Sequence, residues 1–529
     1  MKSKQKVDLL IHNATVYTVD ENFSKAEAVA VNDGKIVAVG NSIDLLEEYV
    51  ATENVDAKNK FIFPGFIDAH AHFFGYGFGL QNADLVGTKS WNEVLEKVKI
   101  HAAKNDDEWI IGRGWNQNEW IEKQFPANDA LNKLFAKRPV VLTRVDGHAL
   151  VANEKALQLA GIKAGDKIEG GEAEVKDGKL TGILVDNAMD PVYSKIPKPS
   201  ETRLKKALLA AEKNCFAAGL TTIVDCGQDY ESALFVDSLQ KNNELKMRLY
   251  IMLSDKQKNY DFLFEKGKIK TDRLHVCSFK LFSDGALGSR GAYLLEPYSD
   301  KPGWNGLLLK PPEYFDSRAK QIFEKGFQMC THAIGDAANR MMLKIYAKYL
   351  QGKNDRRWRI EHAQILDKED FHYFRDYNIV PSVQPTHATS DMYWAEERLG
   401  RERLKFSYAY KELLKTNGCI PLGTDFPVED ISAIKTFYAA VFRKDSKGWP
   451  NQGFQTENAL TREEAIRGMT IWAAKANFEE DEKGSIEKGK YADLVMLDTD
   501  LMNANEKDIL KTKVLMTFLN GQKVFDAKN

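Results

Sequence analysis

Residues 63–72 read Phe-Pro-Gly-Phe-Ile-Asp-Ala-His-Ala-His, an apolar run that ends in two histidines one residue apart. The run predicts a buried strand, and alternate side chains of a strand point to the same face of the sheet. His70 and His72 can therefore reach one metal ion. A single His-x-His pair can arise by chance in a chain with ten histidines. The polar residues at the ends of later strands decide between the two interpretations.

Composition and charge narrow the class of protein. A chain of 529 residues suggests roughly three or four domains, or fewer if one is a large barrel. Hydrophobic residues make up 43% and charged residues 28%, which is typical of a globular protein. The formal net charge of -2 gives no basic excess for phosphate backbones, so we expect no nucleic-acid partner.

The sequence predicts neither a membrane span nor a cysteine-based site. The apolar run near the N-terminus is short and broken by Asp8, and no later segment approaches the ~20 apolar residues of a spanning helix. We therefore expect a cytoplasmic protein without a membrane partner. The five cysteines stand singly, so a thiolate zinc site or a disulfide framework is not expected.

The two ends of the chain are rich in predicted strands. Asp33-Gly34 lies between two alternating runs, which is a strong hairpin signal, and Asn520-Gly521 is a similar turn near the C-terminus. These ends predict one small β-sandwich built from residues 1–61 and 476–529. Two independent β caps are the alternative.

Between residues 62 and 475, strand-like runs alternate with amphipathic helical stretches. The eight strand candidates are Phe61–His70, Thr221–Cys226, Arg248–Leu253, Val276–Phe282, Gly326–His332, Trp358–His362, Ile379–Gln384 and Cys419–Asp425. Eight such units predict an α/β fold, the (β/α)8 TIM barrel, whose active site lies at the carboxyl ends of the strands. Residues from about 75 to 200 exceed an ordinary connection, and predict an inserted subdomain that roofs the site.

Six ionisable groups fall at these strand ends: His70, His72, Lys280, His332, His362 and Asp425. Lys280 lies between Phe279 and Leu281, where a buried ammonium is costly unless it is paired or neutralised. Carbamylation by carbon dioxide would convert this amine into a carboxylate that bridges two cations. Four imidazoles and two carboxylates suit zinc, with manganese, iron or nickel as alternatives.

Five motifs resemble the amidohydrolase superfamily, and within it the branch of the N-substituted formamide deformylases. They begin at Pro64, Lys280, Thr331, Ile360 and Gly423, and read PGFIDAHAH, KLFSDGALGSR, THAIGD, IEHAQ and GTD. The resemblance covers essentially the whole chain, because that family also combines a barrel with a β-sandwich assembled from both ends. Deaminases of the superfamily usually carry a His-x-x-Glu motif, which this chain lacks.

The resemblance implies one or two divalent metal ions. His70, His72 and Asp425 would hold the more buried ion, His332 and His362 the other, and carbamylated Lys280 would bridge them. A bound metal lowers the pKa of water toward ~7 and polarises a carbonyl. Asp425 would be the catalytic residue, taking the proton of the attacking water and passing it to the leaving amine.

Further residues are candidates for substrate contacts or for support of the metal ligands. The candidates for substrate binding are Trp115, Asn116, His148, Asp284 and Arg290. For Asp284 and Arg290, turn formation and a surface ion pair are alternative explanations. Glu361 and Gln364 are expected to orient His362, and His387 is interpreted as a loop residue. Aromatic residues in the predicted loops, such as Tyr393 and Trp394, most often serve packing; our hypothesis is that they bind an apolar substrate, such as one with an aryl group.

We therefore expect a metal-dependent hydrolase that cleaves a non-peptide C–N bond in a small molecule, with a linear amide or N-substituted formamide as substrate. A cyclic amide, carbamate or ester is the alternative within enzymes, because one hydrolytic site serves all of them. A catalytically retired regulatory or binding protein is the alternative from another class. A homodimer is the default oligomeric state.

Overall fold

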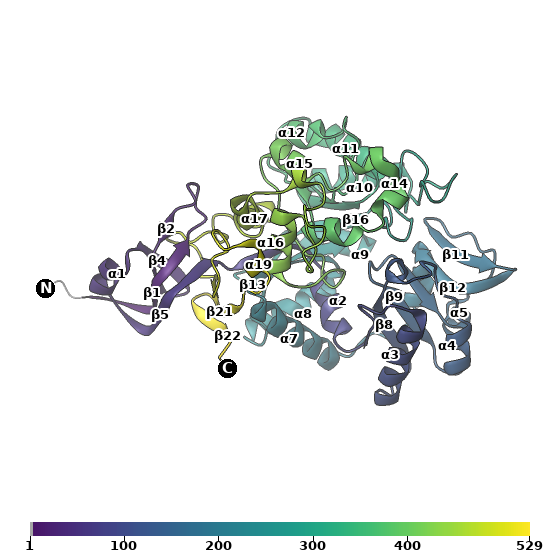
Figure 1. The fold of residues 1–529 in the computed structure, drawn as a ribbon, viewed down its shortest axis with the longest axis horizontal. Helices are drawn as coiled ribbons and strands as arrows, with labels where there is room; N and C mark the ends of the chain where they lie inside the picture. Colours follow the sequence, from purple (N-terminus) through teal and green to yellow (C-terminus); the bar gives the residue numbers. More distant parts are fainter. Residues whose placement is uncertain (1–3, 529) are drawn as a thin grey trace.

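The computed structural model describes residues 4–528 and contains three β-sheets with helices packed around them. In Figure 1 the sheet formed by the chain ends lies at one side, the barrel in the middle and a third sheet at the opposite side. Among the residues that the structure describes, no helix is both long and apolar enough to cross a membrane.

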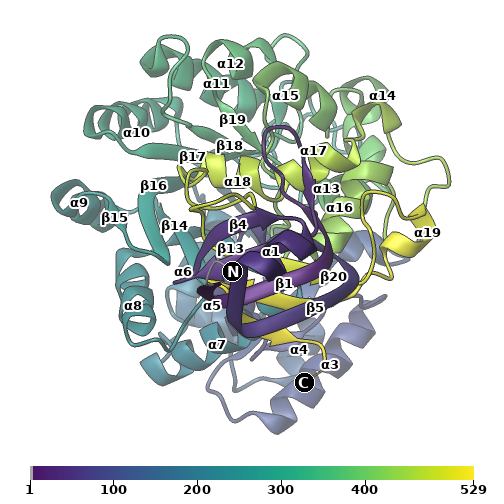
Figure 2. The ribbon, with the colours of Figure 1, turned by 90° about the vertical axis from the view of Figure 1, so that its left-hand side faces the viewer.

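The central sheet is a nearly closed barrel of parallel strands. Its seven main strands pair in chain order: β6 (Phe66–Ala71), β13 (Leu220–Gln228), β14 (Arg248–Ser254), β16 (Leu274–Phe282), β17 (Gln328–Ala333), β18 (Arg359–His362) and β19 (Val380–Ser382). Nearly all of their residues are buried, as expected for strands covered on both faces. The short strand β15 (Ile269–Lys270) pairs with β16 at the rim. Figure 2 shows β14 to β19 as an arc behind the sheet of the chain ends.

The eighth predicted strand closes this barrel without regular strand geometry. Leu422 forms an isolated parallel bridge with Val383, and the amide of Gly423 donates to the Val383 carbonyl at 3.0 Å. On the other side, the amide of Asp425 donates to the His70 carbonyl at 2.7 Å. The segment 419–425 therefore lies between the last strand and the first, which places Asp425 beside His70.

Helices cover the barrel and begin and end where the sequence provides suitable residues. The helix α7 (Glu201–Ala217) begins after Ser200, whose hydroxyl accepts from the amide of Arg203, and it buries Ala207, Leu208 and Cys215. The other barrel helices are α2 (Phe73–Gly79), α8 (Tyr230–Lys241), α9 (Gln257–Lys266), α10 (Pro312–Lys325), α11 (Asp336–Leu350), α12 (His372–Asp376), α13 (Pro385–Asp391), α14 (Ala395–Leu404), α15 (Tyr410–Asn417), α16 (Ala433–Phe442), α17 (Arg462–Gly468) and α18 (Ile471–Ala476).

The predicted first strand Phe61–His70 is wrong as a single element. Residues up to Pro64 belong to β5 (Tyr49–Pro64) in the sheet of the chain ends, and β6 begins at Phe66 in the barrel. Gly65 separates them, because its amide donates to Asp493 at 2.8 Å and a Cβ there would lie 2.4 Å from the Thr221 side chain. A proline followed by this glycine turns the chain from one sheet into the other.

Strands from both chain ends pair in one sheet, which we call the terminal sheet. Its order is β22-β21-β20-β5-β1-β3-β4, with β2 paired to β1. The bounds are β1 (Gln5–Tyr17), β2 (Lys25–Ala26), β3 (Ala28–Asn32), β4 (Lys35–Gly40), β20 (Leu494–Leu497), β21 (Val514–Leu519) and β22 (Gln522–Asp526), with α1 (Ser42–Glu48) and α19 (Glu506–Ile509) nearby in the chain. Asp33-Gly34 and Asn520-Gly521 both connect antiparallel neighbours. The sandwich arrangement and the limits 1–61, 62–475 and 476–529 remain proposals.

Residues between α2 and α7 contain a sheet of their own, which we call the insert sheet. Its order is β11-β12-β10-β9-β8-β7. The bounds are β7 (Ala83–Asp84), β8 (Ile110–Trp115), β9 (Val140–Arg144), β10 (Ala149–Ala152), β11 (Gly171–Lys176) and β12 (Lys179–Asp186), with α3 (Trp91–Lys104), α4 (Asp129–Leu134), α5 (Glu154–Ala160) and α6 (Asp190–Tyr193) beside them. A buried cluster that includes Leu85, Val94 and Leu142 gives this part its own core.

Candidate metal centre

The six predicted ligands meet at the carboxyl ends of the barrel strands. His70 and Lys280 are completely buried, and His332, His362 and Asp425 are each at most 5% exposed. His72, which follows β6, keeps 28% of its side chain exposed. The structure therefore brings the six residues together, as the sequence predicted. That these residues bind a metal ion stays a prediction.

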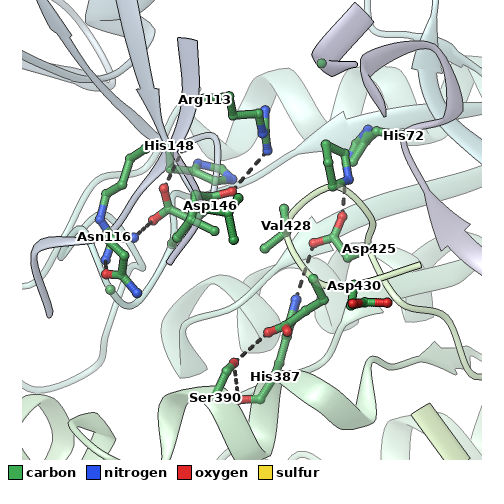
Figure 3. Close-up of a pocket in the computed structure, with 18 of the residues that line it drawn as sticks. His72, Arg113, Asn116, Asp146, His148, His387, Ser390, Asp425, Val428 and Asp430 are labelled. Carbon is green, nitrogen blue, oxygen red and sulfur yellow. Dashed lines mark hydrogen bonds and ion pairs between the residues drawn. The ribbon is translucent and has the colours of Figure 1, made fainter. Parts of the chain in front are cut away.

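The distances within the group match a site that holds a cation. The Nε2 atoms of His70 and His72 lie 3.6 and 3.1 Å from Oδ1 of Asp425. The Nζ of Lys280 lies 3.2 Å from Nε2 of His70. The ring of His362 lies 4.7 Å from that of His70 and 4.6 Å from that of His332. Figure 3 shows His72 and Asp425 facing each other at the cavity.

Hydrogen bonds at the other ring nitrogen orient three of these imidazoles. Nδ1 of His70 contacts Glu361 Oε2 at 2.5 Å, that of His72 contacts the Cys226 carbonyl at 3.1 Å, and that of His362 contacts Gln384 Oε1 at 2.7 Å. Each of these acceptors requires a proton on Nδ1, which leaves the Nε2 lone pair free. Imidazole ligands of metal sites are held in this way.

The environment of the site favours the neutral form of His70, His332 and His362 and the ionised form of Asp425. Burial, with the nearby Lys280, lowers the pKa of His70 to about 4, and burial also takes the pKa values of His332 and His362 well below the usual value. Burial opposes ionisation of Asp425, but its interactions with the surrounding imidazoles hold its pKa well below normal. Neutral imidazoles and an ionised carboxylate are the forms that bind metal ions.

Two buried atoms at the centre lack a hydrogen-bond partner among the described residues. They are Oδ1 of Asp425 and Nε2 of His387. Oδ1 of the ionised Asp425 and Nε2 of His72 lie 3.1 Å apart, although the hydrogen bond of His72 to the Cys226 carbonyl places its proton on Nδ1. A cation between them removes this conflict, so the residues present fit a bound metal ion.

His387 belongs to this centre, and its interpretation as a loop residue is wrong. It lies in α13, is 8% exposed, and its Nε2 is 3.5 Å from Oδ2 of Asp425. His362, His387 and Asp425 form a second group whose ligand atoms all lie within 4.8 Å of one another. Pro385 at the first turn could have indicated a helix that begins directly after the seventh strand.

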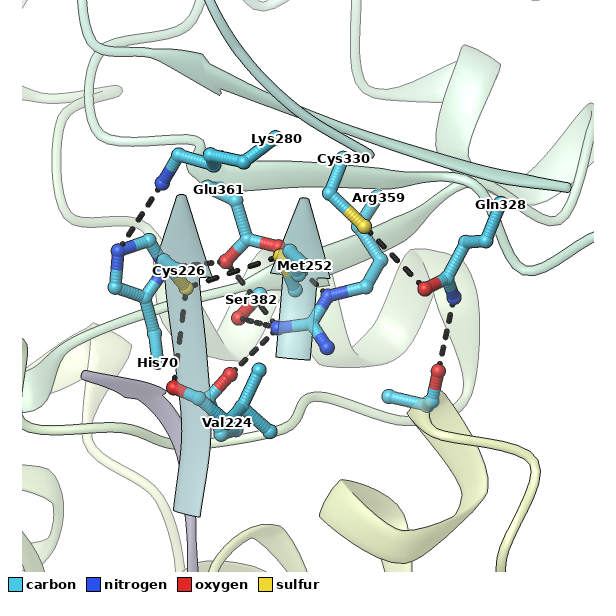
Figure 4. A network of polar contacts seen from close by, with 12 residues as sticks. His70, Val224, Cys226, Met252, Lys280, Gln328, Cys330, Arg359, Glu361 and Ser382 are labelled. Carbon is cyan, nitrogen blue, oxygen red and sulfur yellow. Dashed lines mark hydrogen bonds and ion pairs between the residues drawn. The ribbon is translucent and has the colours of Figure 1, made fainter. Parts of the chain in front are cut away.

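A buried network of charged and polar side chains contacts the proposed ligand His70 through Glu361 (Figure 4). Glu361 pairs with Arg359 at 2.7 Å, and Arg359 also donates to the carbonyl of Ala69 at 2.6 Å and to Ser382 at 2.8 Å. Glu361 therefore orients His70, and not His362 as the sequence predicted. Gln364 instead donates to Asp391 at 3.2 Å, and Gln384 takes the position beside His362.

The backbone is strained at two of the proposed ligands. His362 has φ of 74° and Asp425 has φ of 61°, both in the left-handed region that non-glycine residues seldom adopt. Such conformations persist where the surrounding structure enforces them, and they concentrate at functional sites.

A cavity of about 740 Å³ opens above the centre, between the barrel and the insert. Of the predicted substrate contacts, Asn116 and His148 line this cavity. Nδ1 of His148 lies 2.6 Å from Asp186, and its ring lies 4.9 Å from that of His332. Figure 3 shows Asn116 and His148 on the insert side of the cavity.

The structure places the other three predicted substrate contacts outside the cavity lining. Trp115 is fully buried in the insert and donates from Nε1 to the Leu142 carbonyl at 2.7 Å. Asp284 is fully buried and accepts from the amides of Ile334 and Gly335 at 3.0 and 2.8 Å, which shapes the loop after His332. Arg290 pairs with Asp300 at 2.8 Å, the surface ion pair that was its alternative explanation.

Arg144 and Asp146 line the cavity, and the sequence did not single them out. Arg144 lies at the end of β9 and donates to Gln117 Oε1 and Asn116 Oδ1 at 2.7 Å each. It also pairs with Asp146 at 2.5 Å. The positive charge of Arg144 is therefore neutralised, and the residue fixes Asn116 at the cavity wall.

Barrel, cavity and buried imidazole–carboxylate centre together define a metal-dependent hydrolase. The amidohydrolase family model matches residues 53–525, and the chain belongs to this family. The predicted resemblance to the amidohydrolase superfamily is confirmed.

Relatives and solved structures agree with this assignment. The chain is 32% identical to protein LONG AFTER FAR-RED 3 of Arabidopsis thaliana, over 98% of its length and 91% of the relative. It is 32% identical to the putative amidohydrolase YtcJ of Bacillus subtilis, over 97% and 99%. Identity to the N-substituted formamide deformylase of Arthrobacter pascens is 27%, over 98% of each chain. The structure of an uncharacterized metal-dependent hydrolase from Pyrococcus horikoshii matches with a TM-score of 0.77 and 26% identity, over 94% of this chain and 99% of the other.

Proposed function

We propose that this hydrolase cleaves a non-peptide C–N bond, with a linear amide or an N-substituted formamide as substrate. The observation that carries the proposal is the pair of unpartnered buried atoms, Asp425 Oδ1 and His387 Nε2, at the floor of a cavity of about 740 Å³. The relative from Arthrobacter pascens, which is similar over 98% of both chains, supports the substrate class.

The proposed ligands divide into two sets. His70, His72 and Asp425 would hold one divalent ion, and His332 and His362 a second, with zinc as the favoured metal. His387 lies close enough to Asp425, at 3.5 Å, to join either set. Lys280 would bridge the ions after carbamylation, because its amine is buried and no carboxylate of the described residues lies within 4.0 Å of it. When bound, the metal lowers the pKa of water and polarises the substrate carbonyl.

Asp425 is proposed to move the proton that C–N cleavage requires. Its carboxylate is 5% exposed and ionised at neutral pH, so it can accept a proton from the attacking water. Asp425 lines the cavity, where its carboxyl group can deliver that proton to the leaving nitrogen. Proton transfer by a positioned carboxylate contributes about 10²- to 10⁴-fold to a rate.

His148 is proposed to orient the substrate from the opposite wall. Its Nδ1 is tied to Asp186 at 2.6 Å, so the ring is fixed and its other nitrogen faces the cavity beside His332. Asn116, fixed by Arg144 at 2.7 Å, adds an amide to the same wall. The substrate would therefore lie between metal ligands of the barrel and polar groups of the insert.

Metal analysis of the purified protein, paired with an amide screen, tests the proposal. We expect one to two equivalents of a transition metal, lost in a His70→Ala/His72→Ala variant, and turnover of N-substituted formamides. Turnover of only cyclic amides, carbamates or esters would contradict the proposed substrate class but would be consistent with the proposed metal site. Protein that binds no metal and turns over none of these compounds would support the alternative of a retired binding protein.

A further inference from the structure

A second cavity of about 680 Å³ adjoins the cavity above the metal centre. The two cavities share a set of lining residues, which we call the junction: Glu119, Ser390, Trp394, Glu429, Asp430 and Lys435. None of the proposed metal ligands lines the second cavity. Figure 3 shows Ser390 beside His387 and Asp430 near Asp425, so the junction begins directly beside the centre.

Three parts of the chain build the second cavity. The barrel contributes residues of α13 and α16, such as Thr389 and Tyr438. The insert contributes the short helix η1 (Gln117–Glu119) and the residues Trp120 and Ile121 that follow it. Leu510, from the C-terminal part, completes the wall. The cavity therefore exists only because the insert packs across the barrel loops.

Large apolar side chains converge on this cavity. Trp120 and Tyr438 are each 4% exposed, and Trp394 at the junction is 8% exposed. Ile121, by contrast, is 94% exposed and Tyr393 is 53% exposed. A single exposed apolar residue needs no explanation, but two that line one cavity from different parts of the chain indicate a binding surface.

The ring of Tyr393 is held in place although it is exposed. Its hydroxyl donates to Asp445, whose other carboxylate oxygen accepts from the amides of Lys447 and Trp449 at 2.8 and 2.9 Å. A fixed aromatic ring with an open face loses little conformational entropy when another ring stacks on it. This arrangement favours an aromatic or branched apolar ligand group.

The charges around the second cavity are largely neutralised by one another. Lys123 pairs with Glu397 at 3.0 Å, Lys435 with Asp430 at 2.5 Å and Lys444 with Glu506 at 2.8 Å. Lys89 also pairs with Glu119. Among the described residues, Lys447 is the one lysine of the lining without a carboxylate within 4.0 Å. Glu429 and Asp445, the lining carboxylates without a lysine or arginine partner among the described residues, accept from Ser390 and from Tyr393 and two amides instead. The lining therefore offers little attraction to an anionic group.

We propose that the second cavity is a subsite for an uncharged aromatic or branched apolar group at the far end of the substrate. A linker that crosses the junction would connect this group to the amide at the metal centre. The inference rests on the proposed function in one respect, because it takes the reacting group to be an amide. It adds that good substrates are long, and that contacts in the second cavity, away from the reacting bond, determine which substrates are preferred.

Matched substrates and variants test this subsite. N-(6-Phenylhexyl)formamide carries a ring on a six-carbon linker, whereas N-butylformamide carries the same reacting group without the distal ring. We expect Tyr393→Ala to lower kcat/KM for the long substrate about tenfold, the effect of losing an aromatic contact, and to leave the short substrate unchanged. Ile121→Ser should act in the same direction. Ile100→Ser is the control, since Ile100 is 56% exposed on α3 and lines neither cavity.

Two results separate this inference from the proposed function. Equal kcat/KM for both substrates, or equal losses for both in Tyr393→Ala, would overturn the subsite while leaving amide hydrolysis intact. If neither amide is hydrolysed, binding of both compounds to the same purified proteins is measured by calorimetry. Tighter binding of the long compound, lost in Tyr393→Ala but kept in Ile100→Ser, would then support the subsite although the proposed reaction fails; equal binding would overturn both.

Discussion

Replacement of Glu361 by glutamine is expected to weaken both the fold and the metal centre. Glu361 and Arg359 are completely buried and pair at 2.7 Å, and Glu361 also holds Nδ1 of His70 at 2.5 Å. Glutamine has the same shape but no charge. One of its two terminal groups is an NH2 donor, which must face either the guanidinium or the imidazole N–H, both of which are donors. The guanidinium of Arg359 is then buried without a counter-charge.

The magnitude follows from the pKa of the carboxyl group. Burial alone would raise the pKa of Glu361, but Arg359 and His70 lower it from 4.5 to about 2. Each pKa unit corresponds to about 1.4 kcal/mol, so the charged form is favoured in the fold by about 3 kcal/mol. Breaking a buried ion pair by removing one partner typically costs about 3–5 kcal/mol. We therefore expect a loss of about 3 kcal/mol in the free energy of unfolding.

The same variant should bind metal less tightly, since loss of a group that orients a ligand weakens metal binding about 10- to 100-fold. Urea denaturation of the metal-free protein measures the stability, and titration with zinc against a chelator measures the affinity. Glu402→Gln is the control, because its carboxylate is 84% exposed and pairs with Lys405 on the surface. A Glu361→Gln variant that matches this control in both measurements would refute the reasoning.

Four further predictions concern the centre. Asp425→Asn should keep the fold, checked by circular dichroism, while kcat falls at least about 10²-fold; a variant with near-normal kcat would remove Asp425 from its proposed role. Lys280→Ala should lose the second metal ion in elemental analysis and regain part of its activity with added acetate, and retention of two equivalents would contradict the bridge. Burial lowers the pKa of His70 from 6.5 to about 4, so that on acidification the unfolded state binds a proton before the folded state does. The free energy of unfolding of the metal-free protein should therefore fall by about 3 kcal/mol between pH 6.5 and 4. Equal stability at both pH values in urea denaturation would contradict this prediction. Asp186→Asn should release His148 and lower kcat/KM for the best amide about tenfold with little loss of metal, whereas unchanged kinetics would make the pair structural.

The sequence predicted the features that depend on residues close together along the chain. Strand periodicity placed most of the barrel elements, and the candidate Arg248–Leu253 agrees with β14 (Arg248–Ser254) to within one residue. The convergence of His70, Lys280 and His332 followed as well, because parallel strands bring equivalent positions to one end of a barrel. No knowledge of tertiary contacts was needed beyond the fold class itself.

Features that depend on contacts between distant segments could not be predicted. The split of the first strand at Gly65 requires Thr221, whose side chain would lie 2.4 Å from a Cβ at that position. His387 has no motif around it in the sequence, and it reaches the centre because α13 turns it toward Asp425. Trp115 was a candidate for substrate binding, yet its ring lies in the core of the insert.

The centre and the cavity wall differ in predictability for a physical reason. Most of the proposed ligands lie at the ends of barrel strands, where the pairing of parallel strands fixes their positions. His148, Asn116 and Arg144 project from the insert, and their place above the centre depends on how the insert packs against the barrel loops. We therefore expect the barrel to determine the chemistry and the insert to determine which substrates reach it. A change confined to residues such as Ile121 should alter the range of substrates without disturbing metal binding, because no proposed ligand lines the cavity that Ile121 faces.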